Sequence, residues 1–185
     1  MNKLRVIIVN VCRLILAVTF IISGYVKAID PLGTQYKITD YLAAIDLASM
    51  VPQWTTLLLA VVLAAIEFAL GVFMLFAIKR QITTRLTLAF MAVMTLITVW
   101  IYIADPVKDC GCFGDAFILT NGETLLKNIL LVACAAIVAW QPACMLRLIS
   151  PSNQWLVMNY AVVYKIGRAA GRGRGEISGG AGSLK

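Results

Sequence analysis

Residues 56–78 read TLLLAVVLAAIEFALGVFMLFAI, an apolar run with a single charged residue, Glu67. A helix that crosses the hydrocarbon core of a bilayer needs about 20 mostly apolar residues, so this stretch predicts a transmembrane helix. Three more runs of similar length qualify, at residues 6–26, 86–104 and 125–146. Because short connections join these runs, we predict an all-α, polytopic membrane protein whose four transmembrane helices form an antiparallel bundle.

The composition supports a membrane protein in contact with the lipid bilayer. The 185 residues are 61% hydrophobic and 14% charged, whereas a soluble domain is about half apolar and about a quarter charged. The net charge is +7, but the basic residues form no aromatic-interleaved run and no helix-turn-helix spacing, so we expect no nucleic-acid binding. The chain has no histidine, which excludes His-activated nucleophiles and His-ligated metal or haem.

The two ends of the chain differ in character. Lys3 and Arg5 precede the first apolar run, as they would in a signal peptide, but the run is long and has no small-residue cleavage site before Tyr25. We therefore expect an uncleaved anchor. We expect residues 1–148 to form one membrane domain. Residues 149–185 are expected to form a short apolar segment and a disordered, basic, Gly/Arg-rich tail.

The basic residues predict the orientation, because cytoplasmic connections carry an excess of Lys and Arg. With a cytoplasmic N-terminus, the inner side holds Lys3, Arg5, Lys79, Arg80, Arg85, Arg147 and the basic residues of the tail. The outer side then holds only Lys27, Lys37, Lys108 and Lys127. We predict a multi-pass protein of the bacterial inner (cytoplasmic) membrane, with the N-terminus cytoplasmic and the connection between the third and fourth spans periplasmic.

Both outer connections contain a helical signal. Ile38, Tyr41, Leu42 and Ile45 follow the spacing of one helix face, which predicts a short surface helix in the first connection with Asp40 and Asp46 toward water. This helix either packs at the membrane surface or covers the second connection as a lid. In the second connection, residues 120–123 (TNGE) fit a capping box that begins the fourth span.

The second outer connection also contains residues 108–115, KDCGCFGD, with Cys110 and Cys112 separated by one glycine. A disulfide between residues this close requires a sharp bend, which Gly111 permits. The small ring would be strained, and strained disulfides are the easily reduced, oxidising ones. We therefore predict a redox-active pair, while a structural disulfide and a metal site remain open. Two thiolates alone do not complete a tetrahedral metal site.

The remaining cysteines are Cys12, Cys134 and Cys144. The predicted spans place them near the membrane centre or the inner side. Neither Cys12 nor Cys144 can reach the outer pair, so we expect no cysteine relay across the membrane.

Two charges lie deep within the predicted spans, Arg13 and Glu67. A charge at mid-bilayer costs about 2.5–3.5 kcal/mol even on insertion scales. The depths of the two residues below the inner edge of the membrane differ by a distance that an arginine side chain can span. We predict that they pair and form a polar pocket; the alternative is that Arg13 extends to the inner surface and Glu67 is protonated.

The polar residues around the first span resemble those of DoxX-like membrane proteins. In residues 12–42, CRLILAVTFIISGYVKAIDPLGTQYKITDYL, the matching positions are Arg13, Ser23-Gly24, Lys27, Asp30-Pro31 and Tyr36-Lys37. Glu67 and Gly71 match the Glu-x-x-x-Gly of the second span. The CGCFG segment is similar to that of the MauE branch, the methylamine-utilisation membrane proteins. The resemblance covers about Val6 to Leu148.

The resemblance implies a four-helix inner-membrane protein next to thiol or sulfur redox chemistry. MauE is linked to maturation of methylamine dehydrogenase, whose small subunit carries many disulfides, and DoxD-type relatives to thiosulfate:quinone electron transfer. The site residues expected are Cys110 and Cys112 for the chemistry. The candidate polar-pocket residues are Arg13, Glu67, Lys27, Asp30, Asp109 and Asp115.

Two hypotheses about function follow. In the first, Cys110 and Cys112 exchange thiols with a periplasmic protein and pass electrons to a membrane quinone. In the second, the protein is a non-enzymatic scaffold or assembly partner whose loop is held by a disulfide. The sequence leaves open whether the protein is an enzyme, and it identifies no cofactor beyond the quinone.

The predicted orientation can be tested with a membrane-impermeant thiol reagent. Applied to intact spheroplasts after reduction, it should label Cys110 and Cys112 but not Cys144, because only the first two lie in an outer connection. Labelling of Cys144 from outside would reverse the orientation.

Overall fold

The computed structural model describes residues 3–104, 120–146 and 148. Within these ranges the chain forms α1 (Lys3–Ile29), α2 (Pro31–Ala44), α3 (Gln53–Phe76), α4 (Arg80–Ala104), α5 (Asn121–Trp140) and the short 3-10 helix η1 (Pro142–Cys144). Helices α1, α3, α4 and α5 are long and apolar enough to cross a membrane. The prediction of an all-α membrane protein with four spanning helices is confirmed.

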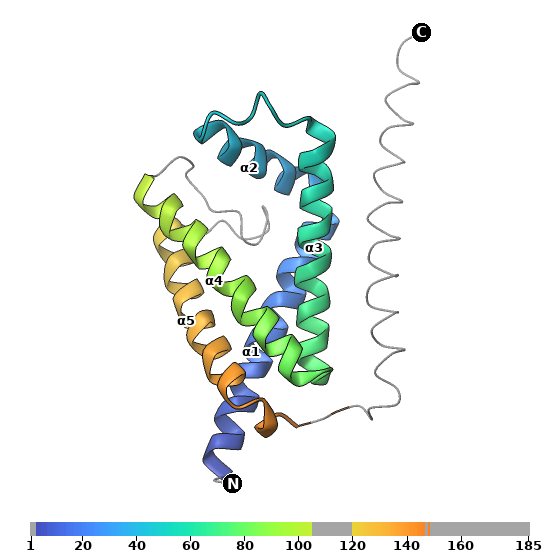
Figure 1. The fold of residues 1–185 in the computed structure, drawn as a ribbon, viewed down its shortest axis with the longest axis vertical. Helices are drawn as coiled ribbons and strands as arrows, with labels where there is room; N and C mark the ends of the chain where they lie inside the picture. Colours follow the sequence, from blue (N-terminus) through green and yellow to red (C-terminus); the bar gives the residue numbers. More distant parts are fainter. Residues whose placement is uncertain (1–2, 105–119, 147, 149–185) are drawn as a thin grey trace.

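The four spanning helices alternate in direction along the chain, and α2 lies across one end of the bundle (Figure 1). We call this end, where α1 ends and α3 begins, the α2 end. The closest partners are α1 with α3 and α4 with α5. Helices α3 and α4 meet at the turn between them and diverge toward the α2 end (Figure 1). The axes of the two helix pairs are therefore farthest apart beneath α2.

One face of α1 lines the interior along nearly its whole length. Its buried residues recur every three or four positions, as expected for the inward stripe of a helix. In order they are Val9, Asn10, Cys12, Arg13, Leu16, Ala17, Phe20, Ser23, Gly24 and Lys27. The middle of this stripe is apolar, whereas both ends carry polar or charged side chains.

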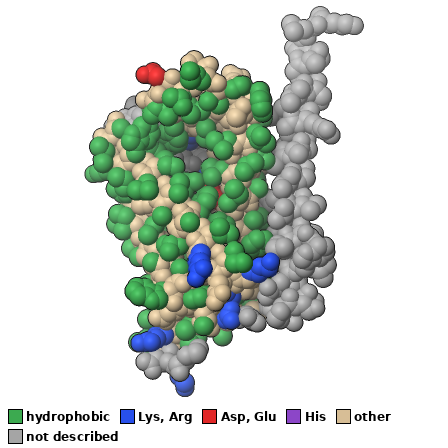
Figure 2. All heavy atoms as spheres, viewed as in Figure 1, with side chains coloured by type: hydrophobic (Ala, Val, Ile, Leu, Met, Phe, Trp, Pro, Cys, Tyr) green, Lys and Arg blue, Asp and Glu red, His purple; other side chains and the backbone are tan. Residues whose placement is uncertain are grey.

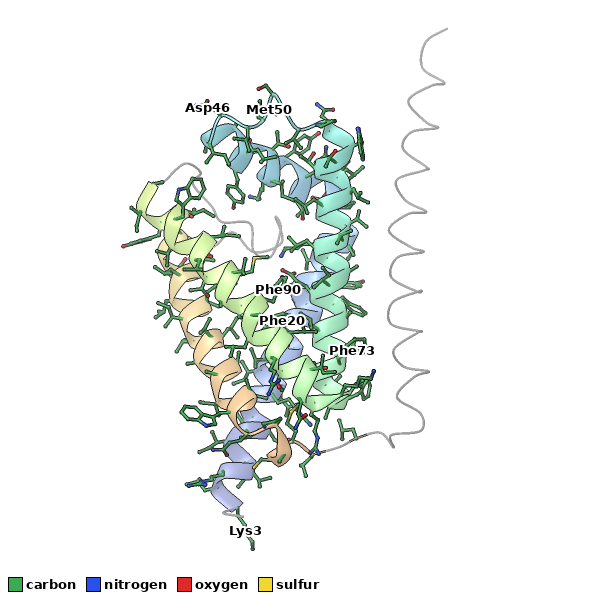
Figure 3. All side chains as sticks on the ribbon, viewed as in Figure 1. Lys3, Phe20, Asp46, Met50, Phe73 and Phe90 are labelled. Atoms are coloured by element: carbon green, nitrogen blue, oxygen red, sulfur yellow. The ribbon has the colours of Figure 1, made fainter. Side chains whose placement is uncertain are left out.

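The apolar core packs around the middle of that stripe. It is formed chiefly by side chains of α1, α3, α4 and α5, including Leu16, Met74, Met91 and Val138. On the side toward α2, the core reaches the rings of Phe20 and Phe90, whose centroids lie 5.6 Å apart with the ring planes tilted by 59° (Figure 3). The polar site described below begins at this aromatic pair.

Two glycines set the distance between α1 and α3. A Cβ atom added at Gly24 would lie 2.5 Å from the backbone nitrogen of Phe68, and one added at Gly71 would lie 2.7 Å from that of Ile21. Both distances are shorter than atoms can tolerate, so neither position accepts a side chain at this spacing. Small residues at facing positions are the usual means by which membrane helices approach closely.

The helix ends differ from the predicted ones for physical reasons. Helix α5 ends at Trp140, not at residue 146, because Pro142 disfavours helical geometry in the residue before it, and Gln141 has φ −128° and ψ 56°. Helix α4 begins at Arg80, several residues before residue 86, since a helix can continue beyond the apolar region. The capping box at the start of α5 is confirmed, with Thr120 and Glu123 bonded reciprocally.

The predicted surface helix is also present, as α2, and it is longer than its apolar pattern suggested. Its Asp40 is exposed, as is Asp46 just beyond its end, as predicted. Ile38 and Tyr41 face inward and line a cavity described below. In the described part of the chain, α2 therefore covers the bundle itself.

The surface agrees with a lipid environment. Large exposed hydrophobic side chains cover the sides of the bundle (Figure 2). Basic side chains gather over the end opposite α2 in this view, and an acidic side chain lies at the α2 end (Figure 2). This distribution supports four membrane spans.

The packing of α1 against α3 can be tested with two glycine substitutions. Gly24→Ala forces the helices apart, because its nearest neighbours are backbone atoms, and should destabilise the protein by roughly 1–3 kcal/mol. Gly122→Ala is the matched control, since its added Cβ would lie 3.7 Å from a Tyr102 side-chain atom. It should leave stability unchanged or raise it by at most about 1 kcal/mol. Denaturant unfolding in detergent micelles measures both; equal effects of the two changes would contradict the close approach.

Candidate functional site

A buried charged cluster joins α1 to α3 on the α2 side of the core. The Lys27 Nζ lies 2.6 Å from Glu67 Oε1, and both side chains are about 95% buried. The Ser23 hydroxyl donates a hydrogen bond of 2.8 Å to the other carboxylate oxygen, Oε2. Each oxygen of Glu67 thus accepts from a different residue of α1. We call Ser23, Lys27 and Glu67 the carboxylate cluster.

The antiparallel arrangement explains how these side chains meet. Ser23 and Lys27 are four residues apart, so they lie on the same face of α1. Side chains on a helix tilt toward its N-terminus. Lys27 therefore leans away from the α2 end, while Glu67 on the antiparallel α3 leans toward it. The side chains of Lys27 and Glu67 therefore meet beside the close contact of the two backbones at Gly24.

The cluster replaces the pairing predicted from the sequence. The structure places Arg13 about 21 Å from Lys27 along α1, and the Arg13 guanidinium donates to the backbone carbonyl of Leu146, not to Glu67. The predicted Arg13–Glu67 pair is wrong. The physical reason is that Arg13 meets unpaired carbonyls where α5 has ended, whereas Glu67 meets a lysine on its own packing face.

Arg13 belongs to a second polar group, at the end opposite α2. The Asn10 side chain donates to the Cys144 carbonyl at 3.1 Å and accepts from the Leu146 N–H at 3.1 Å. Arg80 donates to the carbonyls of Ala143 and Met145. These side chains satisfy backbone groups that the broken helix leaves without partners. We interpret this group as structural.

A small cavity lies beside the carboxylate cluster. Its volume is about 40 Å³, and its walls include Ser23, Lys27, Glu67 and Asn128 above the Phe20–Phe90 pair. We call it the core cavity. One water molecule occupies about 30 Å³ in the liquid and needs two to four polar partners when buried. The core cavity has both the room and the polar groups for one water molecule.

A larger cavity lies closer to the α2 end, between α2, α3 and α4. Its volume is about 240 Å³, and we call it the α2 cavity. Its walls are mainly apolar, with residues such as Leu63, Ile97 and Ile101. Figure 2 shows a hollow in this face of the bundle, ringed by hydrophobic side chains. Lys27 and Met94 line both cavities and so stand between them.

Two buried polar residues that the sequence did not single out complete the wall between α4 and α5. Asn128 donates a hydrogen bond of 2.8 Å to the Thr98 hydroxyl, which itself donates to the Met94 carbonyl. Asn128 lines the core cavity and Thr98 the α2 cavity. Asn128 could have been identified from the sequence, because it is an asparagine within an apolar span, where a polar side chain usually has a hydrogen-bond partner.

The other predicted site residues are distributed as follows. Asp30 is exposed and caps α2, its carboxylate accepting from the Gly33 N–H at 3.0 Å. Cys110, Cys112, Asp109 and Asp115 lie outside the described residues. Cys12, Cys134 and Cys144 are free thiols. In the described ranges no three Cys, Asp or Glu side chains are close enough together to hold a metal ion.

Comparison with known proteins identifies a family. A family model described as methylamine utilisation protein MauE matches residues 5–141, which include all four spanning helices. No curated protein and no solved structure matches the chain. The resemblance to MauE is confirmed, and the wider resemblance to DoxX-like proteins remains a prediction.

The carboxylate cluster can be tested with a double-mutant cycle. Lys27→Met or Glu67→Met alone leaves one charge buried without its partner and should destabilise the protein by about 3–5 kcal/mol. The double variant should lose much less than the sum of the two, because no charge is left unpaired. Reversible unfolding in mixed micelles measures each variant.

Arg13→Met combined with Glu67→Met is the control for this cycle. Since these two residues do not touch, their effects should add to within about 0.5 kcal/mol. Additivity in the Lys27–Glu67 cycle, or strong coupling in the Arg13–Glu67 pair, would contradict the structure.

Proposed function

The chain belongs to the MauE family, and from this membership we propose that it is an inner-membrane protein of methylamine utilisation that performs thiol–disulfide exchange or electron transfer at the periplasmic face. Cys110 and Cys112 are the reacting residues. A periplasmic protein that must acquire disulfides is the thiol partner. The membrane quinone is the electron acceptor.

The proposed reaction balances as two exchanges. In the first, a partner's two thiols become a disulfide, and the Cys110–Cys112 disulfide takes up the two electrons and two protons as two thiols. In the second, Cys110 and Cys112 return to the disulfide and give two electrons and two protons to the quinone, which becomes a quinol. Without such an acceptor the pair would react once and stop.

The observation that carries this proposal is that several features suited to such chemistry lie at the α2 end of the bundle. The connection with the two cysteines joins the end of α4 to the start of α5, and both of these lie at the α2 end (Figure 1). The carboxylate cluster and the α2 cavity lie on the same side of the apolar core. The helix ends that flank the cysteine connection and the space suited to a ligand thus lie at one end of the bundle, which supports the proposal.

The charge around the cysteines shapes the expected reactivity. Asp109 and Asp115 lie close to the pair in sequence, and nearby negative charge disfavours the thiolate. The pair should therefore react slowly with small thiols and require a docked partner. A disulfide closed over one intervening residue would be strained, which would favour reduction and make the pair an oxidant toward that partner.

Redox titration in glutathione buffers tests the proposal. We expect a midpoint above about −250 mV for the Cys110–Cys112 pair, since structural disulfides typically lie below about −300 mV. In addition, Cys112→Ser should trap a mixed disulfide between Cys110 and a periplasmic protein. Cys144→Ser, which leaves the pair intact, is the control and should trap nothing. A midpoint below about −300 mV with no trapped protein would leave the scaffold role.

A further inference from the structure

We propose that the α2 cavity binds the ring of the membrane quinone, with Thr34 and Lys27 donating hydrogen bonds to its carbonyl oxygens. This inference rests on the proposed function, because the balanced reaction needs an acceptor that is soluble in the membrane. It adds the location of the site and the residues that recognise the ligand.

The size of the cavity suits a substituted six-membered ring. An engineered apolar cavity of about 150 Å³ is large enough to bind benzene. The α2 cavity measures about 240 Å³, which leaves room for ring substituents. The core cavity, at about 40 Å³, is too small for a ring. Among these two cavities, only the α2 cavity can hold the ligand.

The hydroxyl of Thr34 is the strongest indication that the α2 cavity binds a ligand. Thr34 lies on α2, is 95% buried and lines the α2 cavity. Its Oγ1 has no hydrogen-bond partner within the described part of the chain. A buried hydroxyl without a hydrogen-bond partner destabilises the fold, because it loses its hydration and gains nothing in exchange. A carbonyl oxygen in the cavity would accept this hydrogen bond and remove that cost.

Lys27 provides the second donor. Its ammonium group has three N–H donors, and in the described residues it makes one hydrogen bond, to Glu67. Lys27 also lines the α2 cavity, so donors remain for a ligand there. Glu67 neutralises the charge of Lys27, so this donor favours a neutral carbonyl over an anionic head group. Quinones carry such carbonyls, whereas phospholipids carry phosphate.

The walls also suit an apolar tail. Helices α3 and α4 diverge toward α2 (Figure 1), and the cavity residues Leu59 and Ile97 on these helices are 53% and 40% exposed. These partly exposed residues place the mouth of the cavity toward the lipid. An isoprenoid tail can leave by this route while the ring stays under α2.

Direct binding of a quinone tests the inference. The full chain in phosphatidylcholine nanodiscs is titrated with a benzoquinone that carries one isoprenoid unit, and the bound fraction is quantified by equilibrium dialysis. Thr34→Val keeps the side-chain shape and removes the donor, so the Kd should rise about 3- to 10-fold, as expected for one hydrogen bond. Thr39→Val on the same helix is the control, because Thr39 bonds the Gln35 carbonyl and does not line the cavity.

A second pair of variants tests the space itself. Leu63→Trp fills the cavity and should weaken binding more than tenfold. Leu58→Trp places the same side chain on the exposed face of α3, where Leu58 is 55% exposed, and should leave the Kd unchanged. Unaltered binding by Leu63→Trp, with folding confirmed by its unfolding transition, would overturn the inference.

The outcome separates this inference from the proposed function. Binding is measured again with Cys110→Ser/Cys112→Ser, which removes the thiol chemistry and should leave the Kd unchanged. If the thiol pair traps a partner but no variant binds the quinone, the cavity assignment is wrong and the proposed thiol exchange survives. If a phospholipid occupies the cavity and the quinone does not displace it, the ligand class is wrong.

Discussion

The close contact between α1 and α3 is the constraint on which the other features of this bundle depend. Gly24 and Gly71 bring the two backbones together, and only at that distance can Lys27 and Ser23 of one helix share the carboxylate of Glu67 on the other. The dependence runs in both directions. The glycines make the pairing possible, while the buried pair makes any separation of the helices costly, because each charge would lose its partner inside the membrane.

The polar ends of the α1 stripe have different roles in this account. Toward the N-terminus, Asn10 and Arg13 satisfy the backbone that follows the broken α5. Toward α2, Ser23 and Lys27 hold the Glu67 carboxylate beside the core cavity, and Lys27 also lines the α2 cavity. The apolar core separates these groups. Because α3 and α4 diverge away from their shared turn, the space for a ligand lies at the α2 end, together with the ends of α4 and α5 that the cysteine connection joins.

Most of the fold could be predicted from the sequence. Long apolar runs identify membrane spans, and the capping box at the start of α5 is a local pattern of four residues. The prediction from the sequence paired Glu67 wrongly, since depth along a helix does not determine which helices pack or which face is shared. The apolar run appeared to end at residue 26, so Lys27 was assigned to the outer connection, although α1 continues to Ile29 and directs that lysine inward. The sequence pattern does not identify Thr34 and Asn128 as site residues, because their positions in the site depend on packing between elements distant in sequence.

We propose that the thiol pair and the membrane quinone exchange electrons at this end of the bundle. The most direct measurement is the thiol state of Cys110 and Cys112, read by mass-tagged alkylation, in membranes whose quinone pool is held oxidised or reduced. We expect a disulfide with the oxidised pool and thiols with the reduced pool, and a loss of this response in Leu63→Trp. A pair that stays oxidised under both conditions would contradict the proposal.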